Sequence, residues 1–343
     1  MVKINLALQG GGAHGAFTWG VLDRILEEDD LEIAAITGTS AGALNGAALK
    51  AGWLENGRQG ARDNLDWLWA QVARLDDVTV PKWMQAWLPT PGAISKSLEY
   101  SPLYQLGDSF GRMISPYAWG PLYQNPLEKI VDQFDFGRVC AMDGPALYVC
   151  ATNVRDGKVR VFEGDAISTQ SILASACLPT LFQAVEVEDP ETGTVEAFWD
   201  GGYTGNPALF PLFEAGLPDD VVIVNINPLK RDTVPVMPNE IQNRINEISF
   251  NSSLLRELRA IEFVQRLISE GKVQEGAMKN LRVHMIADDA LMNDLSVATK
   301  LVAVPTVIDE LKAAGRRAAG TFLAQHKDDL GRRQTTDLVR MFG

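Results

Sequence analysis

The serine at position 40 lies in a pattern that can make a hydroxyl group reactive. The segment Gly38-Thr39-Ser40-Ala41-Gly42 follows the short apolar run 33–37 and precedes the small-residue, helix-like run 43–49. A strand that enters a helix through Gly-x-Ser-x-Gly is typical of a nucleophile elbow, where the turn is too sharp for bulky neighbours. The Ser40 hydroxyl would then lie at a helix N-terminus, which favours developing negative charge. An ordinary small-residue turn is the alternative interpretation.

An earlier glycine-rich stretch could stabilise that negative charge. Gly10-Gly11-Gly12-Ala13-His14-Gly15 follows the apolar run 4–9 and leads into a helical pattern over residues 16–28. It matches Gly-x-Gly-x-x-Gly, but the next strand ends in Ser40 and not in the acidic residue that would hold a ribose. The lysine of a phosphate-binding P-loop is also absent after Gly15. We therefore interpret the stretch as an oxyanion loop of free backbone N–H groups, with a dinucleotide site and a plain turn as alternatives.

A serine nucleophile needs a group that accepts its proton, and the sequence offers few candidates. The histidines are His14 in the glycine loop, His284 in an apolar run and His326 near the polar C-terminal end. None of them is well placed, since we expect His284 to be a core residue and His326 to lie on the surface. Asp200 is better placed, because it ends a predicted strand and two glycines follow it. Its ordinary pKa, ~3.9, is low for a base, but partial burial would raise it. An ordinary Asp-Gly turn is again the alternative.

These motifs together, in this order and topology, resemble the patatin-like phospholipase family. The segment Ser175-Ala176-Cys177-Leu178-Pro179 also resembles the pattern that this family has ahead of its aspartate, and the resemblance covers residues 4–213. It implies an α/β fold, a three-layer α/β/α sandwich with a mostly parallel central sheet, and a Ser–Asp dyad. The residues that it implicates are Ser40 as nucleophile, Asp200 as proton acceptor, Gly10, Gly11 and Gly12 as the oxyanion hole, and Gly15, Gly38, Gly42, Gly201 and Gly202 as supporting glycines. The family usually has Arg or Lys where His14 stands, so we expect His14 to be a substrate contact that could supply a charge only when protonated.

Tryptophan is concentrated in one segment, where the alternation of strands and helices stops. Six of the 8 tryptophans lie within residues 53–123, among prolines and glycines. We expect a partly helical cap inserted at about 53–123 into a catalytic domain that spans 4–213. Most of these rings should only pack the cap onto the body, whereas Trp83 and Trp87 are candidate substrate contacts. Residues 214–343 should complete and cover the same sheet.

Regular elements are predicted on both sides of the cap. The turn Arg155-Asp156-Gly157-Lys158 predicts a hairpin. A second predicted hairpin ends directly before Asp200. Helical patterns cover residues 168–177, 239–270 and 306–326. Strands are predicted at 146–153, 159–162, 184–188, 195–199, 221–225 and 281–287.

Composition and charge narrow the class of protein. The 343 residues are 46% hydrophobic and 22% charged, and no apolar run is long enough to span a membrane. The net charge of −13 argues against nucleic acid and against anionic membranes, so any contact with lipid should be apolar. The 3 cysteines have no metal-site spacing and favour a reduced, cytoplasmic protein. No metal or cofactor is expected.

The resemblance leads to an expected function with two alternatives. We expect a lipid acyl hydrolase of the phospholipase A or lysophospholipase type, acting on carboxylic esters of glycerolipids through an acyl-enzyme. Its partners would be a phospholipid or another acyl ester, with transient contact at a membrane surface. The alternatives are a non-catalytic lipid-binding or regulatory protein on the same scaffold and a dinucleotide-binding oxidoreductase.

Overall fold

One mixed sheet organises the fold, and the first strand lies near its centre. The computed structural model describes residues 1–75, 92, 94–95, 97, 115–188, 193–274 and 276–342. Within these residues the eight-stranded sheet has the order β5-β6-β3-β2-β1-β7-β8, and β4 pairs with β3. The strands β3, β2, β1, β7 and β8 are parallel, whereas β4, β5 and β6 pair antiparallel. The strands are β1 (Val2–Leu8), β2 (Leu31–Thr39), β3 (Ala146–Asn153), β4 (Val159–Glu163), β5 (Val185–Glu188), β6 (Val195–Asp200), β7 (Asp220–Asn225) and β8 (Arg282–Ala287).

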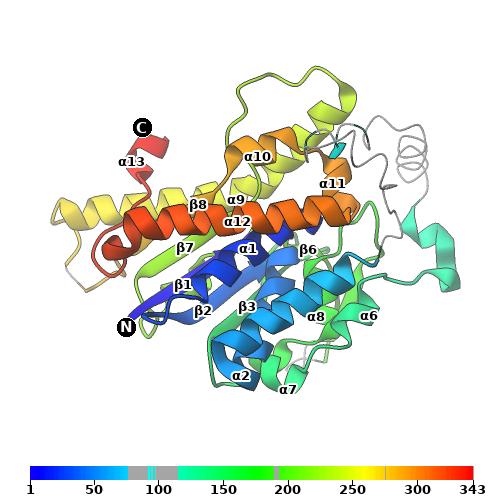
Figure 1. Ribbon diagram of the computed structural model, residues 1–343, viewed down its shortest axis with the longest axis horizontal. Coiled ribbons are helices and arrows are strands. Elements are labelled where there is room, and N and C mark those ends of the chain that lie inside the picture. Colours follow the sequence, from blue (N-terminus) through cyan, green and yellow to red (C-terminus); the bar gives the residue numbers. More distant parts are fainter. Residues whose placement is uncertain are drawn as a thin grey trace.

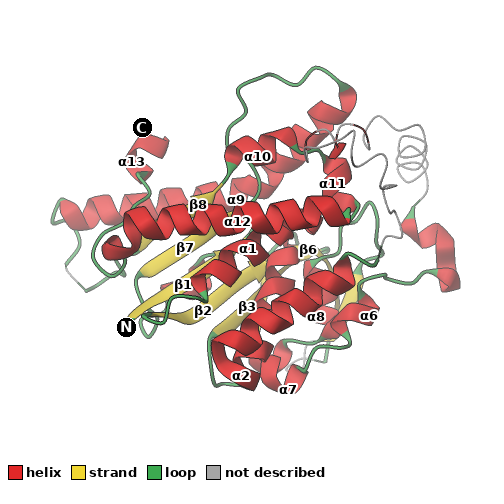
Figure 2. Cartoon of the chain, viewed as in Figure 1, coloured by secondary structure: helices red, strands yellow, loops and turns green. Residues whose placement is uncertain are grey.

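Helices lie on both faces of this sheet, as Figures 1 and 2 show. The α-helices are α1 (Gly15–Ile25), α2 (Ala41–Val72), α6 (Glu128–Val131), α7 (Phe136–Val139), α8 (Thr169–Ser175), α9 (Pro238–Ser269), α10 (Asp289–Asp294), α11 (Val297–Leu301), α12 (Pro305–His326) and α13 (Leu338–Phe342). The 3-10 helices are η1 (Gly12–His14), η2 (Pro116–Leu122), η3 (Gly164–Ala166), η4 (Gly201–Tyr203), η5 (Phe210–Phe213) and η6 (Lys327–Asp329).

Alternating side chains of the strands build two separate cores. In β1, Leu6 and Leu8 point to the face that α1, α2 and α12 cover, whereas Ala7 points to the other face. Leu254 and Leu258 of α9 pack on that second face. In Figure 1, α12 lies along α1 in front of the sheet and α9 lies behind it. The expected three-layer α/β/α architecture with a mostly parallel sheet is therefore confirmed, as are all the predicted strands to within two residues at each end.

The structure corrects the expected start of the cap. Helix α2 continues through residues 53–72, with a kink at Asn56 and Gly57. Leu65, Leu68 and Trp69 of this part are buried in the main core, and the Trp69 ring stacks on Trp19 with 6.1 Å between centroids. Residues 53–72 therefore belong to the body of the fold, because apolar side chains of this segment are part of the main core. Most of the remaining cap segment, including Trp83 and Trp87, lies outside the described residues.

Candidate active site

Strand pairing brings Ser40 and Asp200 together from distant parts of the chain. Thr39, at the end of β2, pairs with Cys150 of β3, and Asp200, at the end of β6, pairs with the next residue, Ala151. Because β4 occupies the other edge of this part of β3, β2 and β6 share one edge and meet end to end. Ser40 follows Thr39 directly, so its side chain and the Asp200 carboxyl lie beside each other at this junction, and the Ser40 side chain lowers the pKa of the carboxyl.

Ser40 has a strained backbone at the point where β2 becomes α2. Its φ of 53° and ψ of −121° make it the one non-glycine residue with positive φ among the residues that the structure describes. A conformation of this kind costs on the order of 1–3 kcal/mol and persists only where the surroundings enforce it. The Ser40 side chain makes no capping bond to the helix. It is therefore available for the carboxyl group instead.

Ser175, at the end of α8, fixes this turn by a hydrogen bond to its backbone. The backbone N–H of Ser40 donates to Ser175 Oγ at 2.9 Å, and Ser175 Oγ donates to the carbonyl of Cys150 at 2.6 Å. Ser175 therefore connects the turn at Ser40 to β3, the strand that pairs with Asp200 of β6. The sequence analysis used the segment that starts at Ser175 only as a family pattern and did not foresee this role.

Asp200 is held by its own backbone and is almost completely buried. Its N–H donates to the Cys177 carbonyl at 2.7 Å, its carbonyl accepts from Thr152 Oγ1 at 2.8 Å, and its Oδ1 accepts from the Gly202 N–H at 2.7 Å. Burial raises the pKa of this carboxyl to about 7, although the hydrogen bonds from Gly202 and Ser40 act in the opposite direction. A carboxylate with a pKa near neutrality can act as a general base, unlike an exposed aspartate.

The glycine loop lies directly against Ser40. A Cβ added at Gly10 would lie 2.8 Å from Ser40 Cβ, so only glycine allows this approach. The N–H of Gly10 already donates to Asn206 Oδ1 at 2.7 Å, which removes it from the expected set of three oxyanion donors. The N–H groups of Gly11 and Gly12 have no partner within the described parts of the chain. Any oxyanion site in this loop would therefore use Gly11 and Gly12.

The other predicted glycines also stand at close contacts. An added Cβ would come within 2.1–2.9 Å of another atom at each of them, which is too close for any side chain. At Gly42 that atom is the carbonyl oxygen of Leu8, so the start of α2 packs directly on the end of β1. These positions are Gly15, Gly38, Gly42, Gly201 and Gly202.

A layer of amide side chains supports the loop and was missed from the sequence. Asn227 Nδ2 donates to the Gly10 carbonyl at 2.8 Å, and the N–H of Asn227 donates to Gln9 Oε1 at 3.0 Å. Gln9 Nε2 donates in turn to Asn251 Oδ1 at 3.2 Å. Asn206, Asn227 and Asn251 are all buried. Isolated asparagines carry no local pattern, so only the fold reveals that they meet.

His14 is present in the loop but is not placed as an exposed cation. Its side chain is buried, and its Nε2 lies 3.0 Å from Thr299 Oγ1. Burial lowers the pKa of His14 well below its usual value, and the charge of Lys300 lowers it further. The side chain is therefore neutral at pH 7, and its burial leaves little surface for the substrate contact that the sequence suggested.

The other two histidines lie in the surroundings expected of them. His284 is buried in β8, where its Nε2 lies 3.0 Å from Asp220 Oδ1. His326 is partly exposed and lies 3.0 Å from Asp329 Oδ2. Neither ring is hydrogen-bonded to Ser40.

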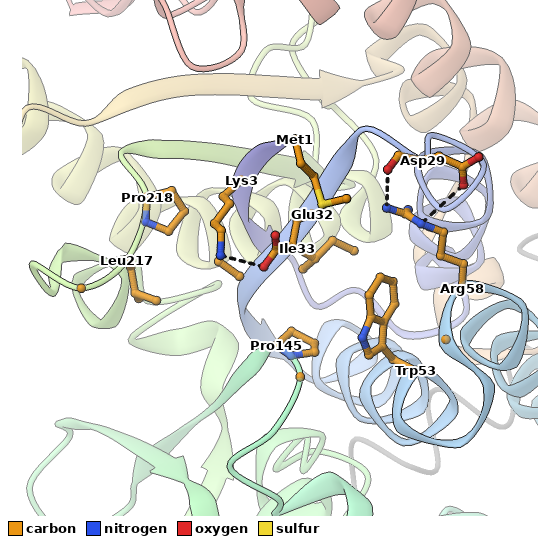
Figure 3. Close-up of a pocket in the computed structure, with 14 residues that line it drawn as sticks. Met1, Lys3, Asp29, Glu32, Ile33, Trp53, Arg58, Pro145, Leu217 and Pro218 are labelled. Carbon is orange, nitrogen blue, oxygen red and sulfur yellow. Dashed lines mark hydrogen bonds and ion pairs between the residues drawn. The ribbon is translucent and has the colours of Figure 1, made fainter.

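A cavity of about 610 Å³ lies at the opposite edge of the sheet, where the parallel strands begin. Figure 3 shows Trp53 and Ile33 beside two ion pairs, of which Lys3 with Glu32 is the shorter at 2.8 Å. None of the predicted site residues lines this cavity. Ser40 lies beyond the other end of β2, so the cavity is separate from the candidate site.

Two further searches of the side chains and helices gave negative results. Among the described residues there is no group of three or more histidine, cysteine or carboxylate side chains that could hold a metal ion. No helix in the same part of the chain is both long and apolar enough to cross a bilayer.

The fold is that of a three-layer α/β/α protein with a serine at a strained strand–helix junction. The chain belongs to the patatin-like phospholipase family, whose model matches residues 6–213. This membership assigns it to the lipid ester hydrolases. It gives no support to the dinucleotide-binding alternative.

Two solved structures are similar to the chain at low sequence identity. One is VipD from Legionella pneumophila, with 15% identity and a TM-score of 0.45, where the match covers 94% of this chain and 67% of that one. The other is the ExoU–SpcU complex from the type III secretion system of Pseudomonas aeruginosa, with 16% identity and a TM-score of 0.30, where 99% of this chain and 65% of that one are covered. No curated protein sequence matches the chain.

Proposed function

We propose that the protein hydrolyses carboxylic esters of glycerolipids with a Ser40–Asp200 dyad, as a phospholipase A or lysophospholipase. The observation that carries this proposal is the juxtaposition of Ser40 and the buried Asp200 carboxyl at the junction of β2 and β6. The strained backbone of Ser40 and the family membership support it. The expected contact with a membrane surface and the cap over residues beyond 75 remain part of the proposal.

The mechanism follows from these positions. Asp200 accepts the proton of Ser40 as the hydroxyl oxygen attacks the ester carbonyl carbon, and the N–H groups of Gly11 and Gly12 stabilise the resulting oxyanion. Donors of this kind contribute about 3–4 kcal/mol each where they have been measured. The tetrahedral intermediate collapses to an acyl-Ser40 ester, and the proton passes from Asp200 to the alcohol that leaves. Water then loses a proton to Asp200 and attacks the acyl carbon. As the bond between the acyl carbon and Ser40 Oγ breaks, Asp200 returns the proton to Ser40 and the fatty acid is released.

The raised pKa of Asp200 predicts an acidic limit to activity. Because the general base must be ionised, kcat/KM should rise with pH through about 7, the pKa of the buried carboxyl. Cys177 and Tyr203 will not contribute to this limb, since burial and the Asp200 charge raise both of their pKa values to about 12. Initial rates on a soluble short-chain ester between pH 5 and 8 measure the limb. A midpoint near 4 would contradict the buried base.

Covalent labelling tests whether Ser40 is activated at all. A fluorophosphonate probe should attach to Ser40 in the parent protein, and peptide mass spectrometry should locate the adduct. We expect no labelling of exposed serines elsewhere in the chain, because Ser40 lies beside a buried carboxyl whose pKa is raised to about 7. Exposed Ser269 serves as the internal comparison. A protein that binds lipid without reacting with the probe would favour the non-catalytic alternative.

A further inference from the structure

Helix α11 contacts the glycine loop (residues 10–15) at two points, and contacts Asn227, which supports this loop, at a third; the proposed mechanism uses none of these contacts. Thr299 Oγ1 lies 3.0 Å from His14 Nε2, and Lys300 Nζ donates to Asn227 Oδ1 at 3.0 Å. The carbonyl oxygen of Lys300 lies so close to Gly12, which has a φ of +58°, that an added Cβ would be only 2.2 Å away. A five-residue helix from the C-terminal part of the chain therefore fixes the position of the loop.

A chain of hydrogen bonds runs from Lys300 into the loop. Lys300 Nζ donates to the side-chain oxygen of Asn227, and the side-chain nitrogen of Asn227 donates to the Gly10 carbonyl at 2.8 Å. The peptide bond after Gly10 is trans, so the Gly11 N–H points in the direction opposite to the Gly10 carbonyl. This series of hydrogen bonds therefore ends at the Gly11 N–H, which we propose as an oxyanion donor. Dipoles aligned in this way strengthen one another.

The charge of Lys300 is not cancelled by the nearest acid. Glu247 is buried and already forms ion pairs with Arg231 at 2.6 Å and Arg244 at 3.2 Å. Three cationic side chains therefore surround one carboxylate next to the loop. His14 is neutral, so the positive charge that acts on the loop is that of Lys300, which is hydrogen-bonded to Asn227.

We propose that Lys300 is a positioning residue for ester hydrolysis, which holds Asn227 against the Gly10–Gly11 peptide and polarises the Gly11 N–H toward the oxyanion. This inference rests on the proposed function. Lys300 acts through Asn227 and the peptide and does not touch the substrate. Its charge should therefore affect the transition state of every ester that the enzyme cleaves.

The first test separates polarisation of the loop from binding of the substrate. In Lys300→Met, kcat should fall about tenfold, a fraction of the 10²- to 10³-fold that removal of an oxyanion donor costs. KM should stay within about twofold, because the interaction grows only as the oxyanion forms. The loss should be equal for a neutral short-chain ester and for phosphatidylcholine in mixed micelles. Lys300→Arg should retain most of the activity, and exposed Lys230→Met is the matched control, with no loss.

The second test uses pH and does not depend on the folding of the Met variant. Burial lowers the pKa of Lys300 to about 8, with Glu247 raising it and Arg231 lowering it. These groups face Lys300 from α9 and from the loop after β7, and His14 faces it from η1. Loss of the ammonium proton should reduce kcat of the parent above pH 8. Lys300→Arg should keep its plateau to pH 10, because a guanidinium stays charged.

Each outcome decides the inference. A Met variant with parental kcat, or an alkaline limb that is identical in the parent and the Arg variant, overturns it. A loss confined to phosphatidylcholine also overturns it, because it would make the ammonium a binding group for the substrate phosphate. If the parent itself neither hydrolyses esters nor reacts with a fluorophosphonate, the proposed function fails first, and the two failures are thereby distinguished.

Discussion

Ser40→Ala is expected to lower kcat for a soluble short-chain ester by about 10⁴- to 10⁶-fold, the range found when a nucleophilic serine is removed from a hydrolase. The alanine variant has no hydroxyl at the junction beside Asp200, so the acyl-enzyme cannot form. Initial rates at pH 8, where the buried carboxyl is ionised, give the comparison. Ser269→Ala, at the exposed end of α9, is the matched control and should match the parent.

The same position makes a separate prediction about stability. Since Ser40 has positive φ, Ser40→Gly should relieve strain and raise the free energy of unfolding, whereas Ser40→Ala should not. Thermal melts of the two variants measure the difference. An alanine variant that folds and still hydrolyses the ester at the parental rate would exclude Ser40 as the nucleophile.

Asp200→Asn should lower kcat by about 10²- to 10⁴-fold, the usual contribution of a positioned general base. The amide keeps the shape of the side chain but cannot accept the proton of Ser40, so fluorophosphonate labelling should slow in parallel. Because burial raises the pKa of Asp200 to about 7, ionising this carboxyl costs stability; the cost builds up as the pH rises from the ordinary pKa of ~3.9 and is fully present above about 7. The Asn variant should therefore melt no earlier than the parent at pH 8.

A surface aspartate supplies the control for this change. Asp219 is partly exposed and lies 3.4 Å from Arg282 at the far end of β7, so Asp219→Asn should leave kcat unchanged. If Asp200→Asn kept most of the parental activity, the base would have to be another group. An earlier melt at pH 8 would contradict the assignment of Asp200 as a charge that the fold disfavours.

Local patterns in the sequence predicted the parts of the site that are built from neighbouring residues. The turn at Ser40 and the loop at Gly10 could be recognised because each motif lies between its own strand and helix. Pairing across the sheet could not be derived in this way. The meeting of β2 and β6 on one edge of β3 depends on the register that pairs Cys150 with Thr39 and Ala151 with Asp200. The family resemblance supplied that step.

The residues that support the glycine loop could not be predicted from the sequence, for a different physical reason. Asn206 and Asn227 bond to a loop about 200 positions away, and Lys300 reaches that loop through Asn227, and such contacts leave no periodicity in the sequence. The same contacts explain why one expected donor was wrong, since Asn206 occupies the N–H of Gly10. The cap was expected to begin too early because the kink at Gly57 interrupts the apolar pattern of α2 without ending the helix.

β1 lies near the centre of the sheet and pairs with β7, which comes after residue 213. The three motifs therefore depend on a C-terminal part of the chain that contains none of them. A chain cut after residue 213 would keep Ser40, Asp200 and every glycine of the three motifs. It would lose β7, and β1 would become an edge strand, whose free backbone groups could pair with another molecule. The glycine loop would also lose Asn227, which bonds to its Gly10 carbonyl, and Lys300, which bonds to Asn227. The smallest active fragment should therefore extend beyond residues 6–213, which are the residues that the family model matches.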